Sequence, residues 1–391
     1  MPELVQIRRQ IHAHPELARQ EFATSDLVAT RLRHAGLAVR DIAGTGLVCD
    51  IAPSAPGGEG GAGERRSEVP RLMLRADLDA LPLAETSGLP FAATNGNAHA
   101  CGHDVHTTVV LGTGLILAQL AAAGDLSTAV RLLFQPAEEV QPGGAQDVIA
   151  AGGLGDYQEI YTLHCDPKLD VGHIGSRIGP ITSASDAVTV TLTGPGGHTS
   201  RPHNSADVVF ALGQVITGAP AVLGRRLDPR AGVNLTWGAV HAGTAPNAIP
   251  SAGTITGTLR CLDETAWEQA EQILGEVIEQ IVAPYGVGVS VDLVRGVPPV
   301  VNDEACVHRV DAAARAALGP DAVVLTEQSL GGEDFGWYLS ESESQVVGAM
   351  VRLGTRTPGG PTYDLHQPDL VIDERAIGHG MRLLATLAAT S

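Results

Sequence analysis

The sequence predicts an α/β protein with a mostly parallel mixed sheet, helices on both faces of that sheet, and an inserted ferredoxin-like α+β domain. Three observations predict this. Apolar strands alternate with helical segments over residues 1–183. The order changes to βαββαβ over residues 184–296, and the first pattern resumes over residues 297–391. A chain of 391 residues also exceeds one ordinary core.

The amino-terminal segment is predicted to form a helix and a pair of strands. Apolar residues on one face indicate a helix over residues 3–36, which Pro15 should break or kink. Residues 37–53 are then expected to form paired strands. Residues 53–70 are rich in proline, glycine and charge, which is typical of a loop, and they carry no chemistry that we can assign.

Three apolar strands follow, and each ends in polar side chains. The strands around Leu74 and Leu133 lead into carboxylates, and the strand "EIYTLHC" leads into His164. A buried helix over residues 109–124 lies between the first two strands. Because ligands gather at the carboxyl ends of strands in such sheets, we expect a site at this edge.

The second domain is predicted from four strands and two helices in the order βαββαβ. The strands cover residues 187–194, 232–243, 253–263 and 288–294, and the helices cover residues 206–223 and 265–286. This order is that of a ferredoxin-like sandwich. A helix over residues 306–319, a strand over 346–354 and a final helix ending near Leu387 then complete the first domain.

The composition argues against several kinds of partner. The chain has 25 Lys and Arg against 44 Asp and Glu, a net charge of −19, which disfavours nucleic acid and anionic membranes. The amino terminus lacks the apolar core of a signal peptide, and no apolar run approaches the roughly 20 residues of a membrane span. The five widely spaced cysteines indicate no disulfide framework. We therefore expect a cytoplasmic protein.

A dense cluster of metal-binding side chains lies in "HACGHDVHTT", residues 99–108. Cys101 and His103 are close enough in sequence to hold one ion, and thiolate and imidazole suit zinc and neighbouring transition metals. The pattern is not that of a structural zinc site of the type C-x-x-C…C-x-x-C, because the sequence has no second cysteine pair. A catalytic centre with an open coordination position therefore fits better.

Further candidates lie downstream of this cluster. In "FQPAEE" we assign Glu139 as a ligand and Glu138 as the general base that takes a proton from a metal-activated water. His164, and His366 in "YDLHQP", are the remaining candidate ligands. Five ligands, one of them bridging, can hold two metal ions, and paired ions suit the hydrolysis of an amide.

The chain resembles the aminoacylase and carboxypeptidase superfamily of dinuclear metallohydrolases. Within it, the chain is similar to the branch of hippurate hydrolases, N-acyl amino acid amidohydrolases and plant auxin-conjugate hydrolases. The resemblance covers nearly the whole chain and rests on motifs in the family's order: "RRQIHAHPELARQE", "RADLDALPL", "HACGHDVHT", "FQPAEE", "GPGGHTSRPH", "APNAIP", "GGEDF" and "LHQP".

The resemblance implies a division of labour between the domains. Residues 1–183 and 297–391 would form a zinc-peptidase-like, metal-binding catalytic domain, and residues 184–296 an inserted dimerisation or lid domain. Glu138 would be the general base. The implied metal ligands are Cys101, His103, Glu139, His164 and His366.

The sequence departs from the wider superfamily in one place. Many members have a histidine two residues before an aspartate as the first metal ligand, where this chain has Arg75 and Asp77. Cys101 and His103 would compensate, with Cys101 as the expected bridging ligand. Asp77 is then predicted to orient a histidine from outside the ligand set. The alternative is a strand-end carboxylate that only caps a loop.

The resemblance also implies substrate contacts in the inserted domain. In similar enzymes this domain dimerises, and a histidine of one subunit stabilises the oxyanion in the other; His198 matches that histidine. Asn247 and Arg260 match groups that bind a substrate carboxylate, for which a guanidinium is well suited. An ordinary salt bridge is the alternative for Arg260. His203 and the glycines of "GGEDF" are further candidates.

We therefore expect a metal-dependent amidohydrolase that cleaves the amide bond of N-acyl or N-aroyl amino acids. Its cofactors would be two divalent transition-metal ions per subunit, from among zinc, manganese, cobalt and nickel. The expected partners are a small N-acyl amino acid substrate and a second copy of the chain in a homodimer. A dipeptidase or carboxypeptidase of the same chemistry is the nearest alternative, and a non-catalytic metal-binding homologue is a third.

Overall fold

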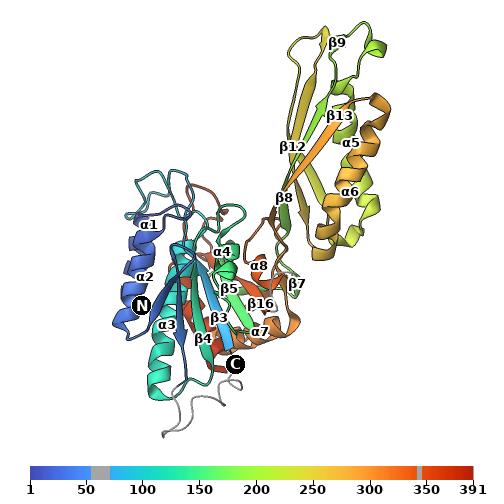
Figure 1. Cartoon of the computed structure of the whole chain (residues 1–391). Helices are drawn as coiled ribbons and strands as arrows, with labels where there is room; N and C mark the ends of the chain where they lie inside the picture. The colour runs from blue at the N-terminus through green and yellow to red at the C-terminus, as the bar shows by residue number, and fades with distance from the viewer. Residues whose placement is uncertain (54–70, 341–345, 391) are drawn as a thin grey trace. The chain divides into compact units, whose positions relative to one another are not determined.

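The computed structural model describes residues 1–53, 71–340 and 346–390, and the chain forms two compact units (Figure 1). The larger unit comprises residues 1–179, 301–327 and 337–391. The smaller unit comprises residues 180–300 together with residues 328–336. The predicted loop over residues 53–70 lies, apart from Pro53, outside the described residues.

An eight-stranded mixed sheet forms the core of the larger unit, in the spatial order β1-β2-β4-β3-β5-β16-β6-β15. Strands β4, β3, β5 and β16 are parallel to one another, and antiparallel pairings occur at β1–β2, β2–β4 and β16–β6. The predicted mostly parallel sheet is therefore confirmed. The bounds are β1 Val39–Ile42, β2 Gly46–Ile51, β3 Arg71–Asp77, β4 Ala129–Gln135, β5 Glu159–Asp170, β6 Ile174–Ser176, β15 Val323–Leu325 and β16 Val347–Arg356.

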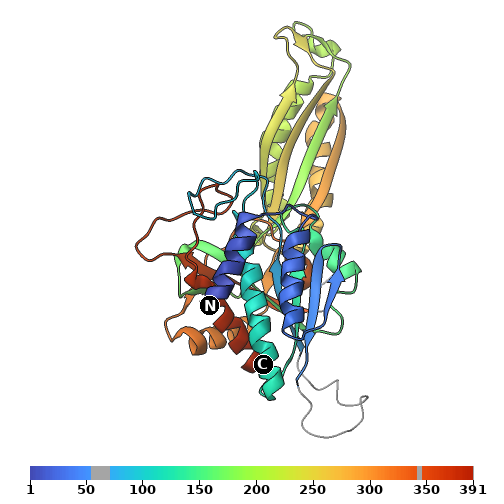
Figure 2. The ribbon, with the colours of Figure 1, turned by 90° about the vertical axis from the view of Figure 1, so that its left-hand side faces the viewer.

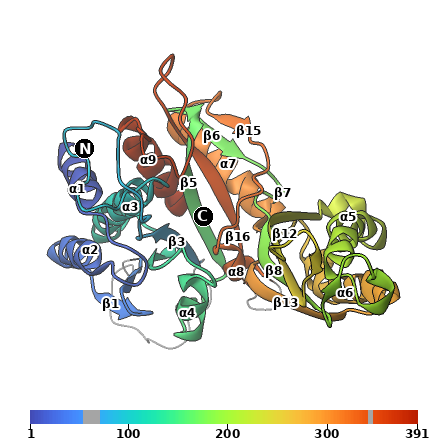
Figure 3. The same ribbon diagram turned by 90° about the horizontal axis from the view of Figure 1, so that it is seen from above.

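The helix predicted over residues 3–36 is two helices, α1 Pro2–Ala13 and α2 Phe22–His34. The break falls around Pro15, where the ring of proline removes a backbone donor. Further along the chain lie α3 His103–Ala123, α4 Gly144–Ala150, α7 Glu304–Leu318, α8 Gly336–Leu339 and α9 Arg375–Thr390. Figure 3 shows α4 on the other side of the sheet from α3.

Helix α3 is the central helix of the larger unit. It packs against β3, α1 and α9 (Figure 2), and beyond Thr108 it is almost entirely apolar, as is typical of a buried helix. It begins at His103, six residues before the predicted start at Val109, and residues 103–108, all polar except Val105, are buried within its first turns. Gly124, in a left-handed conformation, ends it as predicted.

The smaller unit has the βαββαβ order that the sequence predicts. Its four strands pair in the order β10-β12-β8-β13, with every pairing antiparallel, and α5 and α6 pack against them. Asp207 and Asp263 cap the starts of the two helices, since each carboxylate accepts a backbone hydrogen bond. The bounds are β8 Ala184–Thr193, α5 Val208–Arg226, β10 Asn234–Ala242, β12 Ala252–Cys261, α6 Glu264–Val282 and β13 Gly288–Val297.

Several short elements complete the described chain. The two-residue strands β9 Gly197–His198 and β11 Ala248–Ile249 pair with each other in the smaller unit. The 3₁₀ helices are η1 Pro202–Asn204, η2 Pro229–Ala231 and η3 Ala283–Tyr285. The short strands β7 Gly179–Pro180 and β14 Val301–Asn302 lie next to the boundaries between the units.

Two helices are long and apolar enough to cross a membrane by length and composition alone, although the sequence was expected to hold no such run. They are α3 and the helix α5, Val208–Arg226. In α3, 67% of the apolar window is buried inside the protein, as in the core helix of a globular unit. In α5 the corresponding share is 33%, with its inner face on the sheet of the smaller unit. This makes them weak indications of a membrane span.

Candidate metal centre

The candidate ligands meet where neighbouring parallel strands end. Strand β3 ends at Asp77 and β4 ends at Gln135, which are directly paired in the sheet. In β5 the candidate ligand His164 lies two residues beyond Thr162, the partner of Arg75 in β3. Strand β5 continues to Asp170, so His164 is within the strand and not at its end as predicted. Helix α3 starts beside this edge and supplies His103.

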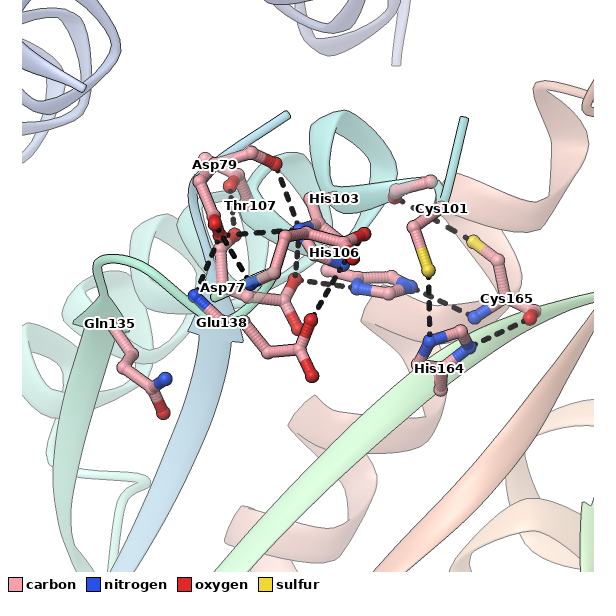
Figure 4. A network of polar contacts seen from close by, with 12 residues as sticks. Asp77, Asp79, Cys101, His103, His106, Thr107, Gln135, Glu138, His164 and Cys165 are labelled. Atoms are coloured by element: carbon pink, nitrogen blue, oxygen red, sulfur yellow. Dashed lines mark hydrogen bonds and ion pairs between the residues drawn. The ribbon is translucent and has the colours of Figure 1, made fainter. Parts of the chain in front are cut away.

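Cys101, His103 and His164 form one compact group (Figure 4). Each offers one ligand atom, these atoms lie within 4.8 Å of one another, and all three residues are buried. Cys101 Sγ lies 3.4 Å from Nε2 of His164. The three side chains come from the loop before α3, the first turn of α3, and β5.

Backbone carbonyl groups fix the tautomers of both histidines. Nδ1 of His103 donates to the carbonyl oxygen of Asp79 at 2.8 Å, and Nδ1 of His164 donates to that of Cys165 at 2.9 Å. A neutral imidazole that donates from Nδ1 carries a lone pair on Nε2. Both Nε2 atoms are therefore prepared to coordinate a metal ion, with the second ring nitrogen held as is usual for metal ligands.

Glu138, Glu139 and His366 lie against this group. Nε2 of His103 is 3.8 Å from Glu138 Oε2 and 3.7 Å from Glu139 Oε1, and Nε2 of His366 is 3.4 Å from Glu139 Oε2. Cys101, Glu139 and His366 form a second group with ligand atoms within 4.8 Å of one another. Cys101 thus belongs to both groups, and the structure brings all five predicted ligands and Glu138 together.

The residues present fit metal ions. Nε2 of His103 and Oε1 of Glu139 are buried and have no hydrogen-bond partner. An unsatisfied buried polar atom is costly, and two of them facing each other at 3.7 Å are explained by bound cations beside them. Thiolate, imidazole and carboxylate are the donors of transition-metal sites, so these groups can hold divalent metal ions.

The electrostatics of the two buried histidines differ. Burial alone would lower the pKa of His103, but the negative charges of Asp77, Asp79 and Glu139 raise it to about 10. Burial lowers the pKa of His164 well below its usual value, and the charge of Arg352 acts in the same direction. The site around His103 therefore attracts a cation, and a metal ion bound there has to displace a proton.

Asp77 accepts a hydrogen bond from a histidine, and that histidine is His106, which is not one of the candidate ligands. Its Oδ1 accepts from Nδ1 of His106 at 2.7 Å and lies 3.7 Å from Nδ1 of the candidate ligand His103. Nε2 of His106 in turn accepts the backbone N–H of Cys165 at 2.8 Å. Arg75 donates to the other oxygen of Asp77 at 2.6 Å, so the arginine at the position of the family's first ligand balances this buried carboxylate.

Unusual backbone conformations occur at the site. Gly102, between Cys101 and His103, has φ +86°, and a Cβ there would lie 2.9 Å from Sγ of Cys165. Only glycine fits this position without strain. Ala137 and His366 have φ 57° and 60°, which non-glycine residues rarely adopt. Such strain is often concentrated at functional sites, where surrounding contacts hold it in place.

The remaining candidates lie in the smaller unit. His198 on β9 pairs with Ala248 on β11, so the ribbon brings His198 next to Asn247. Nδ1 of His198 accepts the backbone N–H of Ser200 at 3.1 Å, so the neutral ring carries its hydrogen on Nε2. Arg260 on β12 donates to the carbonyl oxygen of Leu330. His203 lies exposed in η1.

Sequence reasoning missed Asp79. The backbone N–H groups of Glu138 and Glu139 donate to its two carboxylate oxygens, each at 2.9 Å. It also missed Glu21, whose carboxylate accepts the backbone N–H of Ala137 at 2.8 Å. The only signal for either residue was its place in a quoted motif, because a hydrogen bond to a backbone group leaves no pattern in the partner's sequence.

Comparisons with known proteins find similar sequences and structures. Residues 73–390 match the model of the peptidase family M20/M25/M40. A solved structure of the Bacillus subtilis YXEP protein, described as a dinuclear metal-binding peptidase from the M20 family, superposes with a TM-score of 0.84 at 32% identity. It covers 100% of this chain and 97% of the other.

Two curated relatives cover nearly all of this chain. The N-acetyl-L-cysteine deacetylase of Bacillus subtilis is 37% identical over 96% of this chain and 85% of its own length. The putative glutamate–cysteine ligase 2-3 of Rhodococcus jostii is 46% identical over 98% of this chain. The match spans only 46% of that relative, so this chain corresponds to about half of it.

Proposed function

Because the chain belongs to the peptidase family M20/M25/M40 and is a hydrolase that acts on amide bonds, we propose that it hydrolyses N-acyl or N-aroyl amino acids. The reaction would depend on divalent metal ions and on Glu138 as the general base. The observation that carries the proposal is the pair of ligand groups sharing Cys101, with the carboxylate of Glu138 3.8 Å from a ligand atom of one of them.

The assignment of ligands follows these groups. One ion would be held by Cys101, His103 and His164, and a second by Cys101, Glu139 and His366, with the sulfur of Cys101 shared. When bound, the metal ions would lower the pKa of a bound water, so that it can lose a proton and attack at neutral pH. They would also polarise the amide carbonyl. Zinc, manganese, cobalt and nickel all suit this donor set.

Glu138 is assigned the proton transfers. Its side chain is 10% exposed, and its backbone N–H is anchored on Asp79, so its carboxylate is held beside the ligands. It would take a proton from the attacking water and pass that proton to the leaving amine. A glutamate serves in this role because it can lose and regain a proton near the reacting atoms.

Residues of the smaller unit are assigned to the substrate. His198 carries a hydrogen on Nε2 when neutral, so it can donate to the oxyanion that develops on the carbonyl. Asn247 and Arg260 would bind the carboxylate of the amino acid, for which a guanidinium offers two parallel donors. We propose that the active protein is a homodimer, which the resemblance to similar enzymes implies for this domain.

The substrate class is supported by a relative, and the nearest alternative by another. The name of the Bacillus subtilis deacetylase points to a small N-acyl amino acid. The description of the YXEP protein as a peptidase favours a dipeptidase or carboxypeptidase with the same chemistry. We propose a cytoplasmic location, since all five cysteines are buried and form no disulfide within the described residues.

The test is a substrate panel with a base variant. The chelator-treated protein, reloaded separately with Zn²⁺, Mn²⁺, Co²⁺ or Ni²⁺, is assayed on hippurate, N-acetylcysteine, other N-acetyl amino acids and dipeptides. We expect the acyl amino acids to be preferred, and Glu138→Gln to lower kcat by at least about 100-fold while metal remains bound. Glu279→Gln, an exposed change on α6, is the matched control. A Glu138→Gln variant with normal turnover, or a preference for dipeptides, would contradict the proposal.

A further inference from the structure

Three consecutive backbone N–H groups in the larger unit point at buried carboxylates. The N–H of Ala137 donates to Glu21 at 2.8 Å, and those of Glu138 and Glu139 donate to the two oxygens of Asp79 at 2.9 Å each. Both accepting residues are fully buried, at 0% exposed. The segment they hold, residues 136–139, is called the glutamate turn here.

The glutamate turn is in a conformation that its own sequence does not favour. Ala137 has φ 57°, in the left-handed region that costs an alanine free energy. Its carbonyl oxygen accepts the N–H of Gly144 at 2.8 Å, and a Cβ on Gly144 would lie 1.9 Å from the carbonyl oxygen of Pro136. Contacts from outside the turn therefore have to hold it in place.

Asp79 contacts three site residues. Besides the two N–H groups, its carbonyl oxygen accepts from Nδ1 of His103 at 2.8 Å. One residue thus fixes the backbone of Glu138 and Glu139 and the ring orientation of His103. The distances of 3.8 Å and 3.7 Å from Nε2 of His103 to the two glutamates depend on this common anchor.

Glu21 supports the turn from the start of α2. Its Oε1 accepts two backbone N–H groups, those of Arg19 at 2.9 Å and Ala137 at 2.8 Å. Its Oε2 accepts the hydroxyl of Thr45, at the turn between β1 and β2. The amino-terminal helices and the first hairpin are thereby connected to the strained residue that precedes the proposed base.

We propose that Asp79 and Glu21 are positioning residues that hold the glutamate turn, and with it Glu138 and Glu139, in the geometry that metal binding and proton transfer require. The inference rests on the proposed function for the role of Glu138. It concerns metal affinity as well as catalysis, because Glu139 and His103 are candidate ligands. Neither positioning residue coordinates a metal or contacts a reacting atom in this scheme.

Isosteric variants separate the roles of the two carboxylates. Each oxygen of Asp79 faces an N–H donor, so the NH₂ group of Asp79→Asn must face one of those donors and lose its hydrogen bond. In Glu21→Gln the amide oxygen can keep both N–H groups, and its NH₂ can donate to the hydroxyl of Thr45, which also accepts. We therefore expect Asp79→Asn to be damaging and Glu21→Gln to be milder than Glu21→Ala.

The experiment measures Co²⁺ binding to the chelator-treated full chain by calorimetry, together with kcat and KM on hippurate and N-acetylcysteine. For Asp79→Asn we expect Co²⁺ affinity and kcat each to fall by about 10–100-fold with KM changing far less, as for residues that orient metal ligands. Asp26→Asn, an exposed change on α2, is the control. Thermal unfolding of the metal-free variants is measured in parallel.

The outcomes decide the inference as follows. A folded Asp79→Asn protein with wild-type Co²⁺ affinity and kcat overturns the inference, whatever its thermal stability. A residue with a merely structural role would change only the thermal stability. Should Asp79→Asn not fold, the Glu21 pair decides: weaker Co²⁺ binding in Glu21→Ala than in Glu21→Gln supports the inference, and equal binding overturns it. If the wild type hydrolyses no amide, the proposed function fails, while the Co²⁺ comparison still tests the positioning role.

Discussion

The sulfur of Cys101 lies 3.4 Å from Nε2 of His164, a ring nitrogen whose lone pair is directed by the bond from Nδ1 to the carbonyl of Cys165. The loop before α3 and strand β5 therefore present a thiolate and an imidazole to the same point. Because Cys101 also lies within 4.8 Å of the ligand atoms of Glu139 and His366, its loss should affect both ligand groups.

We accordingly predict that Cys101→Ser lowers Co²⁺ affinity by more than about 100-fold. This loss is larger than the one expected when a residue that only orients a ligand is replaced. The near-ultraviolet charge-transfer band of a cobalt–thiolate bond should disappear as well. Absorption titration of the metal-free protein measures both. Cys306→Ala, on α7, should keep the band and the affinity. If the Cys101→Ser protein retained the band, Cys101 would not be the thiolate ligand.

Gly102→Ala should destabilise the protein and weaken metal binding together. The backbone at φ +86° costs an alanine about 1–3 kcal/mol. The contact of the new Cβ at 2.9 Å from the Cys165 side chain costs about 1–3 kcal/mol more. Gly36→Ala is the matched control, since it has φ +80° and no atom within 4 Å of its Cβ. It should lose only about 1–2 kcal/mol and bind Co²⁺ normally. Urea unfolding and cobalt titration measure the two effects. Equal losses of stability and of Co²⁺ affinity in Gly102→Ala and Gly36→Ala would refute the prediction.

The start of α9 should contribute to acid sensitivity through Asp373. Hydrogen bonds from the side chain and backbone of Arg375 lower the pKa of Asp373 to about 2, against burial, which would raise it. Because the folded value lies below the unfolded value, the stabilisation is present above about pH 4 and is lost as the pH falls towards 2.

Asp373→Asn should therefore cost about 1–2 kcal/mol at pH 7 and progressively less towards pH 2. Chemical unfolding of the metal-free protein at several pH values measures this difference. Arg375→Gln, which removes the guanidinium partner but keeps the carboxylate, should flatten the pH dependence partway. A cost of Asp373→Asn that is the same at pH 3 and pH 7 would contradict the linkage.

A mixing experiment tests whether His198 acts on the partner's active site. His198→Ala and Glu138→Gln should each be nearly inactive alone. If the proteins exchange subunits, half of the dimers are hybrids, and each hybrid has one intact site when His198 acts in trans. We predict recovery of up to about a quarter of wild-type activity, measured after equal mixing with light scattering to establish the dimer. No recovery in a sample proven to contain hybrids would assign His198 to its own chain.

The ligand candidates could be predicted from the sequence because cysteine, histidine and glutamate are recognisable as metal ligands from residue type alone. Cys101, His103 and Glu139 are clustered within short motifs, and the ordered set of motifs carried the family. The fold was accessible for a similar reason. The order of strands and helices differs between the two domains, so the sequence shows where one gives way to the other. Gly124 correctly predicted the end of α3, and Pro15 correctly predicted the break between α1 and α2.

The sequence did not reveal what holds these residues in place. Asp79 and Glu21 act on backbone N–H groups, which every residue type offers, so no spacing rule points to their partners. The early start of α3 was missed because residues 103–108 are mostly polar yet buried, and periodicity identifies helices from apolar faces. Strand β5 extends beyond His164 because β16 pairs with it as far as Asp170, a long-range contact.

The position of β16 in the sheet has a consequence for how the protein folds during its synthesis. In the sheet β16 lies between β5 and β6, although residues 347–356 are made long after both. Ribosomes add about 5–20 residues per second. One edge of β5 therefore stays unpaired for several seconds, during which residues 180–300, most of the smaller unit, are synthesised. An unpaired apolar strand edge invites association with other chains. Nascent or truncated forms ending before residue 347 should therefore depend on chaperones and aggregate without them, whereas the finished chain closes that gap with its own late strand.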